Sequence, residues 1–251
     1  MRRIEIIGLE GLGEIAEGAS IARLISQACS RLGLSLVEAD ILVVAHKIVS
    51  KAEGRIIHLD AIEPSARALE LATQLDKDSR LVEIILRESR RIVRMGRGAI
   101  IVETHHGFIC ANAGVDLSNA GLGKAIVLPR DPDRSAERIR EELRELTGVA
   151  PGVIISDSFG RPWRLGTTDV AIGVSGLRPL RDYRGESDHY GYELKASIAA
   201  LADEIASAAE LVMGKKDGVP VVLVRGCRVE SGKGSAQEIL RPQAEDLFRN
   251  F

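Results

Sequence analysis

The chain has 251 residues, enough for one large domain or two small ones and too many for a disulfide-stapled mini-protein. Hydrophobic residues make up 45% and charged residues 28%, which excludes a disordered chain and allows a sizeable core. The formal net charge of -2 gives no overall field to attract a polyanion or an anionic membrane, and an aromatic share of 3% leaves few base-stacking platforms. We therefore expect neither nucleic-acid nor membrane binding.

Three cysteines, Cys29, Cys110 and Cys227, lie far apart without metal-binding spacing. Their odd number favours reduced thiols over a disulfide framework. The N-terminus reaches acidic Glu5 before any long apolar run, and no stretch approaches the ~20 apolar residues of a membrane span. We expect a cytoplasmic protein.

The first third of the chain predicts a strand at 4–7, a glycine-rich loop, and an amphipathic helix that begins after Ser20. The apolar run 39–45 is typical of a strand buried on both faces. The polar stretch after it, 46–59, is interpreted as a turn that returns to β structure.

In the middle of the chain, apolar residues recurring every three or four positions predict helices at 65–75 and 79–93. Strands follow at 99–103 and 107–110, and the His105–Gly107 stretch between them favours a hairpin turn.

The last third predicts a helix at 135–146 that ends at Gly148, a strand at 152–155, and a loop over 156–166. Steps of four and three predict a long helix over 194–212, and a final buried strand covers 219–224.

Because several strands are joined by hairpins rather than by helical crossovers, the pattern favours an α+β fold with mixed or antiparallel sheets and packed helices. A doubly wound parallel sheet is the alternative. No repeat or linker divides the sequence, so residues 1–251 are expected to form a single domain.

Two glycine-rich motifs suggest nucleotide loops without matching them fully. Gly11-x-Gly13-x-x-Ala16 fits the dinucleotide fingerprint in form, but Gly18 would break a helix that must begin inside the motif. The stretch 226–235 resembles a Walker loop, yet its glycine spacing is one residue long and Gly234 replaces the hydroxyl residue. We predict no P-loop, and an NAD site only as a weak alternative to a plain turn.

The strongest local signal is a pair of acidic loops, each at the end of an apolar strand. One runs from Asn112 to Asn119 around Asp116, and the other includes Asp157 and Ser158. Short oxygen-bearing side chains beside glycines are what Mg²⁺ or Mn²⁺ coordinates, whereas scattered Cys and His disfavour zinc. The same residues are also ordinary turn formers.

Positive charges accompany these loops. Arg161 and Arg164 follow the second loop, and an arginine fork suits phosphate or carboxylate oxygens. Lys47 and Lys51 follow a buried strand and fit either phosphate contacts or an ordinary surface. The residues alone therefore predict an enzyme that uses a divalent cation and an anionic, phosphorylated ligand.

At these loops the sequence resembles the coenzyme F420-0:L-glutamate ligase (F420 gamma-glutamyl ligase) family, including the ligase domain of its bacterial two-domain members. The matching strings, in chain order, are EGL, SKAEGR, NAGVDLSN, SDSFGRPWRLG, AIGVSG, YGYEL, ADEIASAAELVMG, VRG and LRPQAEDLF. The resemblance covers nearly the whole chain. The flavin-reductase-like domain of the two-domain members is not expected here, and whether a separate reductase acts as a partner stays open.

The resemblance implies an intertwined homodimer that uses GTP with Mg²⁺ or Mn²⁺. The substrates implied are L-glutamate and F420-0 or dehydro-F420-0. The implied reaction activates the terminal carboxylate of the coenzyme as an acyl phosphate, which the glutamate amine attacks as GDP and phosphate leave. Phosphorylation meets the chemical need, because a free carboxylate is a poor electrophile.

The resemblance also implies roles for residues at matching positions. Asp116, Asp157 and Ser158 resemble metal ligands, and Arg161 and Arg164 are added as anion contacts from residue chemistry. The positions that resemble nucleotide contacts are Glu10, Gly11, Leu12, His46, Lys47, Lys51, Asn119, Met213, Gly214, Lys215 and Lys216. Lys215 falls near a position where some archaeal members carry an acidic metal ligand, which counts against a second metal. Two other classes remain: a binding module without chemistry, and an NAD-dependent oxidoreductase.

Overall fold

The computed structural model describes residues 2–96 and 98–246. Its central feature is a five-stranded mixed sheet in the order β1-β12-β2-β8-β9. The strands are β1 (Glu5–Gly8), β12 (Val221–Arg225), β2 (Ile41–Ala45), β8 (Gly152–Arg161) and β9 (Arg164–Ser175). β2 and β8 pair in parallel, and the other neighbours pair antiparallel.

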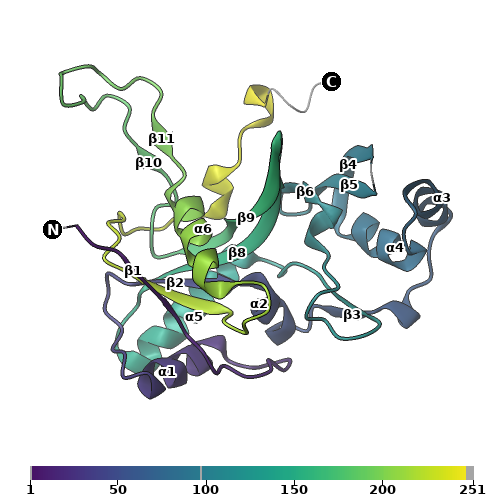
Figure 1. Ribbon diagram of the computed structural model, residues 1–251, viewed down its shortest axis with the longest axis horizontal. Coiled ribbons are helices and arrows are strands. Elements are labelled where there is room, and N and C mark those ends of the chain that lie inside the picture. The colour runs from purple at the N-terminus through teal and green to yellow at the C-terminus, as the bar shows by residue number, and fades with distance from the viewer. Residues whose placement is uncertain (1, 97, 247–251) are drawn as a thin grey trace.

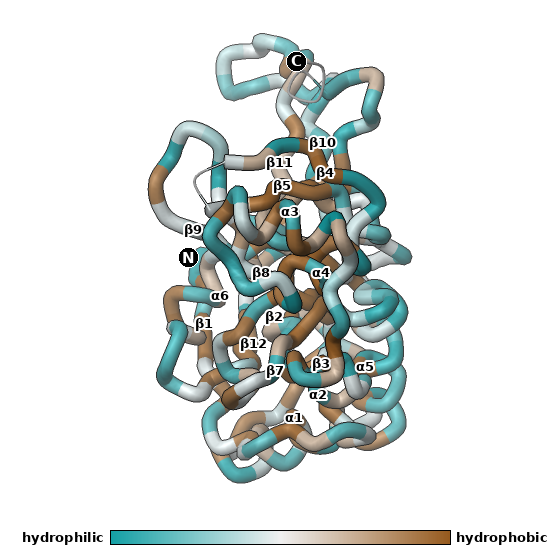
Figure 2. The backbone as a smooth tube through the Cα atoms, turned by 90° about the vertical axis from the view of Figure 1, so that its right-hand side faces the viewer, coloured by the Kyte–Doolittle hydropathy of each residue, from teal (hydrophilic) through white to brown (hydrophobic). Residues whose placement is uncertain are grey.

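Helices cover both faces of this sheet, with α6 in front of it and α1 and α5 behind it in the view of Figure 1. This arrangement explains the continuous apolar runs, since the first four residues of β2 are all buried. Figure 2 shows hydrophobic residues concentrated along the central strands. The helices are α1 (Ile21–Arg31), α2 (His46–Ala52), α3 (Ala66–Leu75), α4 (Ser79–Arg87), α5 (Pro132–Thr147) and α6 (Leu201–Met213).

A second group of elements packs beside the sheet around its own apolar cluster, which includes Leu71, Ile85 and Ile100. α3 and α4 lie against a three-stranded antiparallel sheet in this group (Figure 1). The smaller strands of the chain are β3 (Ile56–His58), β4 (Ser89–Gly96), β5 (Ala99–Thr104), β6 (Ile109–Ala111), β7 (Lys124–Ile126), β10 (Arg181–Asp182) and β11 (Ile198–Ala199).

The α+β class predicted from the sequence is confirmed, as are several element ends. Ser20 and Ser65 cap α1 and α3 by accepting backbone N–H groups, and Gly148 ends α5 in the left-handed conformation. The loop that follows β1 continues to Ser20 before α1 begins, so the dinucleotide fingerprint is absent, as expected. No helix within the described ranges is long and apolar enough to cross a membrane.

Four predicted elements were wrong. The expected turn at 46–59 contains the helix α2, and the helix expected at 79–93 ends at Arg87, where β4 takes over. The loop expected at 156–166 is the continuation of β8 and its turn into β9. α6 begins only at Leu201, because Ile198 belongs to the short β11. In each case pairing with a neighbouring strand, or packing against the sheet, outweighed local periodicity.

Glu83 on α4 fastens α3 to α4 and provides a stability prediction. Its buried carboxylate accepts hydrogen bonds from the Ser65 N–H and hydroxyl at 3.0 and 2.6 Å, and from Arg87 Nε at 2.8 Å. These hydrogen bonds, the Ser65 hydroxyl first, lower the pKa of Glu83 from 4.5 to about 2. The carboxylate therefore stabilises the fold fully above about pH 4.5, and this contribution is lost as the pH falls toward 2.

We predict that Glu83→Gln lowers the free energy of unfolding at neutral pH by about 1–3 kcal/mol, because a buried charge-assisted network is removed. Urea denaturation measures the change. The difference in the free energy of unfolding between the variant and the wild type should narrow toward pH 3. The control is Glu70→Gln, which removes an exposed i,i+3 pair with Arg67 and should lower the free energy of unfolding by under about 1 kcal/mol. An undiminished difference for Glu83→Gln at low pH would contradict the role of the ionised carboxylate.

Candidate functional site

A pocket of about 250 Å³ lies where β1 and β2 end and β12 begins, beside the middle of β8. β2 and β8 are parallel, and the register sets Ala45 beside Ser156. β12 runs antiparallel to β2 and therefore begins at this edge, and β1 runs antiparallel to β12 and ends there. Crevices beyond the carboxyl ends of parallel strands are the usual ligand sites of open sheets.

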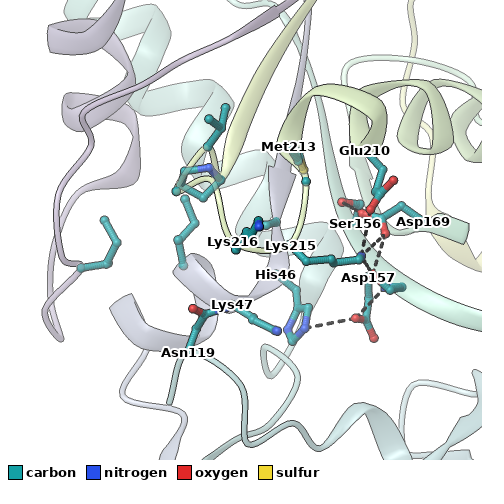
Figure 3. Close-up of a pocket in the computed structure, with 18 of the residues that line it drawn as sticks. His46, Lys47, Asn119, Ser156, Asp157, Asp169, Glu210, Met213, Lys215 and Lys216 are labelled. Atoms are coloured by element: carbon teal, nitrogen blue, oxygen red, sulfur yellow. Dashed lines mark hydrogen bonds and ion pairs between the residues drawn. The ribbon is translucent and has the colours of Figure 1, made fainter. Parts of the chain in front are cut away.

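Five segments far apart in sequence form the pocket wall, and Figure 3 shows the labelled side chains around a common space. They are the loop after β1, the start of α2, the loop that carries Asn119, the middle of β8 with the facing part of β9, and the segment from the end of α6 to β12. The principal polar lining residues are Glu14, His46, Lys47, Lys51, Asn119, Ser156, Asp157, Ser158, Asp169, Glu210, Lys215 and Lys216.

A β-bulge shapes the wall formed by β8 and β9. Ile155 pairs with Gly173 but Ser156 pairs with Ala171, so Ile172 is the extra residue of β9. Bulges of this kind change the direction of side chains near functional sites. Beyond it, Ser158 faces Asp169 directly across the two strands.

Asp169 is buried between two serines. Its carboxylate accepts a hydrogen bond from Ser158 Oγ at 2.6 Å and another from Ser156 Oγ at 3.1 Å. These hydroxyls satisfy a carboxylate that is 5% exposed.

The Lys215 ammonium lies against this group of oxygen atoms. Lys215 Nζ donates to Ser158 Oγ at 2.5 Å and lies 3.1 Å from Glu210 Oε1 and 3.5 Å from Asp169 Oδ1. Burial acts to lower the pKa of Lys215, but the charge of Asp169 and the Glu210 contact outweigh it and raise the pKa above 10.5. The side chain therefore brings a fixed positive charge to the carboxylates.

Asp157 faces the opposite side of β8 and meets α2. His46 Nε2 lies 3.2 Å from Asp157 Oδ1, and Figure 3 shows this contact as a dashed line. His46 is 3% exposed, which places the Asp157 carboxylate beside a buried ring. The Ser158 N–H also donates to Asp157 Oδ1 at 2.7 Å.

The acidic loop around Asp116 contacts Lys47, the residue after His46 on α2. Lys47 Nζ lies 2.6 Å from Asp116 Oδ2, and Ser118 donates to Asp116 through its N–H at 2.7 Å. Burial raises the pKa of Asp116, but the hydrogen bond from Lys47 and the Ser118 N–H bring it below its ordinary value. Asn119, at the end of this loop, takes the left-handed conformation with φ of +58° and lines the pocket.

The two acidic loops thus reach the consecutive residues His46 and Lys47. Within the described ranges, no three His, Cys, Asp or Glu side chains are grouped so that they could hold a metal ion. The available donors are carboxylate and hydroxyl oxygens, which fit Mg²⁺ or Mn²⁺. Mg²⁺ is commonly held by one or two carboxylates and completes its shell with water and substrate phosphates. The residues therefore fit a cation that arrives with a phosphate ligand.

Most residues predicted from the sequence to bind nucleotide or metal lie in this pocket, although their roles stay predictions. Asp116 does not line the pocket itself but contacts Lys47, which does. The predicted residues that line the pocket are His46, Lys47, Lys51, Asn119, Asp157, Ser158, Met213, Gly214, Lys215 and Lys216.

Besides Asp116, five predicted residues lie outside the lining. Glu10, Gly11 and Leu12 precede it in the loop after β1, where the Glu10 and Gly11 carbonyls accept hydrogen bonds from Arg31, and Gly13 to Ile15 form the wall instead. Arg161 and Arg164 stand at the exposed turn between β8 and β9.

The sequence analysis did not identify four polar residues of the wall: Glu14, Ser156, Asp169 and Glu210. Asp169 lies just beyond the loop expected over 156–166. A strand interpretation of 156–175 would have placed it opposite Ser158, because antiparallel partners share a face. Glu210 lies on α6 beside apolar residues and gave no separate signal.

Comparison with known proteins identifies the family. The profile described as F420-0:Gamma-glutamyl ligase matches residues 11–226. The chain belongs to this ligase family. It is 51% identical to the coenzyme F420:L-glutamate ligase of Methanopyrus kandleri over 98% of this chain and 97% of that protein. The ligase of the same name from Methanocaldococcus jannaschii is 48% identical over 99% and 98%. The one from Methanothermobacter thermautotrophicus is 50% identical over 98% and 99%.

Cys110 is a buried thiol close to the pocket residue Asp157. Burial, with the nearby charge of Asp157, raises the pKa of the Cys110 thiol to about 12. We predict that iodoacetamide at about pH 8 leaves Cys110 unmodified in the native protein, because the thiolate is the reactive form. Peptide mass spectrometry after native and urea-unfolded labelling tests this. Equal modification in both samples would contradict it.

Proposed function

We propose that the chain is a GTP-dependent ligase that adds γ-linked L-glutamate to coenzyme F420-0 or its dehydro form and releases GDP and phosphate. The observation that carries the proposal is the pocket at the strand ends. There Lys47, Lys51, Lys215 and Lys216 meet the carboxylates Asp157 and Asp169 in a member of the F420-0:gamma-glutamyl ligase family. The names of the close relatives supply the substrates.

The charges of the pocket suit phosphoryl transfer. Forming an amide from a carboxylate requires activation, and an acyl phosphate supplies the leaving group. Negative charge then builds on the transferred phosphoryl oxygens, which positioned cations stabilise. Lys216 lines the pocket without an ion-pair partner among the described residues, so its ammonium is available to a phosphate.

The remaining lysines are paired weakly enough to exchange partners. Lys51 lies 2.5 Å from Glu14 Oε1, but the Glu14 side chain is 83% exposed, so this pair contributes little. Lys47 holds Asp116, and Lys215 holds Asp169 and Glu210. A triphosphate entering the pocket would offer these ammonium groups a more highly charged partner.

Asp116 and Asp157 are proposed as ligands of the divalent cation, with the Ser158 hydroxyl beside them. When bound, Mg²⁺ or Mn²⁺ would neutralise phosphate charge as a Lewis acid. His46 positions Asp157 through the 3.2 Å contact, and Lys47 positions Asp116. Asn119 offers an amide to the nucleotide at the opposite wall.

A thermal-shift assay separates the candidate functions. GTP with Mn²⁺ should raise the melting temperature of the protein, because a ligand that binds the native state stabilises it. NAD should not, and stabilisation by NAD alone would favour an oxidoreductase instead. Incubation with F420-0, L-glutamate, GTP and Mn²⁺ should add the mass of a glutamyl residue to the coenzyme and form GDP. Tight GTP binding without this product would favour a binding module.

We predict that Asp157→Asn and Asp116→Asn each lower the turnover number by about 100-fold or more, because each substitution removes an anionic oxygen from the phosphate-transfer site. Steady-state GDP release measures the change. Asp60→Asn is the matched control, since Asp60 is exposed on a short 3-10 helix away from the pocket. Full activity in either pocket variant would remove that aspartate from the proposed machinery.

We also propose that two chains form a homodimer through the projecting hairpin of β10 and β11, which extends away from the body in Figure 1. Its side chains include Tyr190, 93% exposed, and Tyr192, 65% exposed. Leu165, at the end of the neighbouring hairpin, is 98% exposed. Large exposed apolar groups concentrated on projecting segments mark association surfaces.

Replacement of Tyr190 and Tyr192 by Ser is predicted to weaken the dimer about tenfold or more, since tyrosines often dominate interface free energy. Sedimentation equilibrium over a range of concentrations gives the dissociation constant. Substitution of Tyr183, which is 36% exposed at the base of the hairpin under the Arg181 guanidinium, is the control. A wild-type protein that stays monomeric at all concentrations would exclude the dimer.

A further inference from the structure

A second cleft, of about 1000 Å³, lies on the sheet away from the pocket. The pocket includes Asp169 of β9, whereas the second cleft begins at Ile172 and continues to Ser175. Asp169 and Ser175 are six residues apart on one strand, which corresponds to about 20 Å. The start of α5, the His105–His106 turn and the loop 231–234 complete the cleft.

Positive side chains dominate this cleft although the whole chain has a formal net charge of -2. Five Lys or Arg residues line it against three Asp or Glu residues. Arg90 is 3.9 Å from a Glu103 oxygen. In the part of the chain that the structure describes, the other four cations make no ion pair; they are Arg130, Arg134, Arg140 and Lys233.

Two of the three carboxylates of the cleft accept hydrogen bonds from backbone N–H groups. Asp131 caps α5 by accepting the Arg134 N–H at 3.1 Å. Asp133 accepts the N–H groups of Val174 and Ala236 at 2.8 and 3.0 Å, so it joins α5 to β9 and to the C-terminal segment. Glu137, the third carboxylate, is not within 4 Å of a Lys or Arg nitrogen among the described residues. The cations are therefore not neutralised by their own neighbours.

Arg140 is held in place without a polar partner. Its Nε atom is buried and has no hydrogen-bond partner among the described residues. Gly176, at φ of +83°, leaves the space for the guanidinium, because a Cβ there would lie 2.4 Å from Arg140 Nε. His106 Nδ1, at the facing turn, is likewise buried without a partner. Unsatisfied buried donors and acceptors are rare in native proteins and call for an explanation.

The loop 231–234 is the stretch that resembles a Walker motif in the sequence. Its glycines have a packing role, because a Cβ on Gly234 would lie 2.1 Å from the Leu177 carbonyl oxygen. The Gly232 N–H donates to the Gly176 carbonyl at 3.3 Å, which fixes the loop beside the guanidinium of Arg140. Packing does not explain Lys233, whose exposed side chain lines the cleft.

We propose that this cleft is a second anion site, for a small molecule that carries two or more closely spaced phosphate or carboxylate groups. Cations from separate segments converge on one concave surface, and arginine binds both kinds of oxyanion bidentately. The site is distinct from the nucleotide pocket and goes beyond the proposed ligase reaction. Pyrophosphate represents the phosphate class, and tri-γ-glutamate represents the carboxylate class.

Isothermal titration calorimetry of the full chain at low salt, without GTP, coenzyme or divalent metal, tests the site. The variant Arg134→Gln with Lys233→Gln removes two exposed cations of the cleft. The control, Arg23→Gln with Arg144→Gln, removes the same charge from exposed positions on α1 and α5 outside the cleft. Equal melting temperatures of the two variants would show that both are folded.

We expect the cleft variant to lose one class of binding site, or to bind about tenfold more weakly, whereas the control keeps wild-type binding. Preference for pyrophosphate or for tri-γ-glutamate would then assign the ligand class. Identical binding in the wild type and both variants, or no binding of either probe to the wild type, would overturn the proposal. Because no ligase substrate is present, this result does not depend on the proposed reaction.

Discussion

The parallel pairing of β2 with β8 is the constraint on which the site depends. It brings Ala45 beside Ser156 although the two residues are more than a hundred positions apart. His46 and Lys47 then follow one strand while Asp157 and Ser158 continue along the other, so cationic and acidic groups face a common space. Antiparallel pairing of the same strands would have placed the start of α2 at the opposite edge of the sheet.

Charge compensation in the pocket is local and readily exchanged. Each acidic group has a basic partner at hand: Lys47 for Asp116, Lys215 for Asp169, and the His46 ring beside Asp157. The Lys47–Asp116 pair is partly exposed and contributes little to stability, so its rearrangement around a ligand costs little. The apolar body of the sheet supplies the stability instead, since the strand interiors on both sides of the pocket are buried.

The sequence was sufficient where the determining forces are local. Serine caps marked the starts of α1 and α3, and the buried runs marked β2 and β12. The acidic loops were identified from the oxygen-rich side chains around Asp116 and Asp157. The resemblance to the ligase family was confirmed by the family match.

What the sequence could not supply was long-range pairing. The turn-rich stretch after Ile155 was interpreted as a loop, because Gly, Pro, Asp and Ser normally form turns. The edge strand β9 instead extends it into a hairpin and brings Asp169 into the pocket. Similarly, the short α2 has no side-chain hydrogen bond at its N-cap, so the sequence carried no capping signal that would predict this helix. The second cleft combines residues from five separate regions of the chain, and no local pattern could have predicted it.

The extra residue of β9, Ile172, stands between Asp169, which lines the pocket, and Ser175, which lines the second cleft. Side chains alternate strictly along a strand, so a shift by one position exchanges its two surfaces. Removing Ile172 would not shift the pairs, since Gly173 would still face Ile155 and Ala171 would still face Ser156, but it would remove the local bend and extra twist that the bulge gives β9. The course of β9 between the pocket and the second cleft therefore depends on one residue added to the strand.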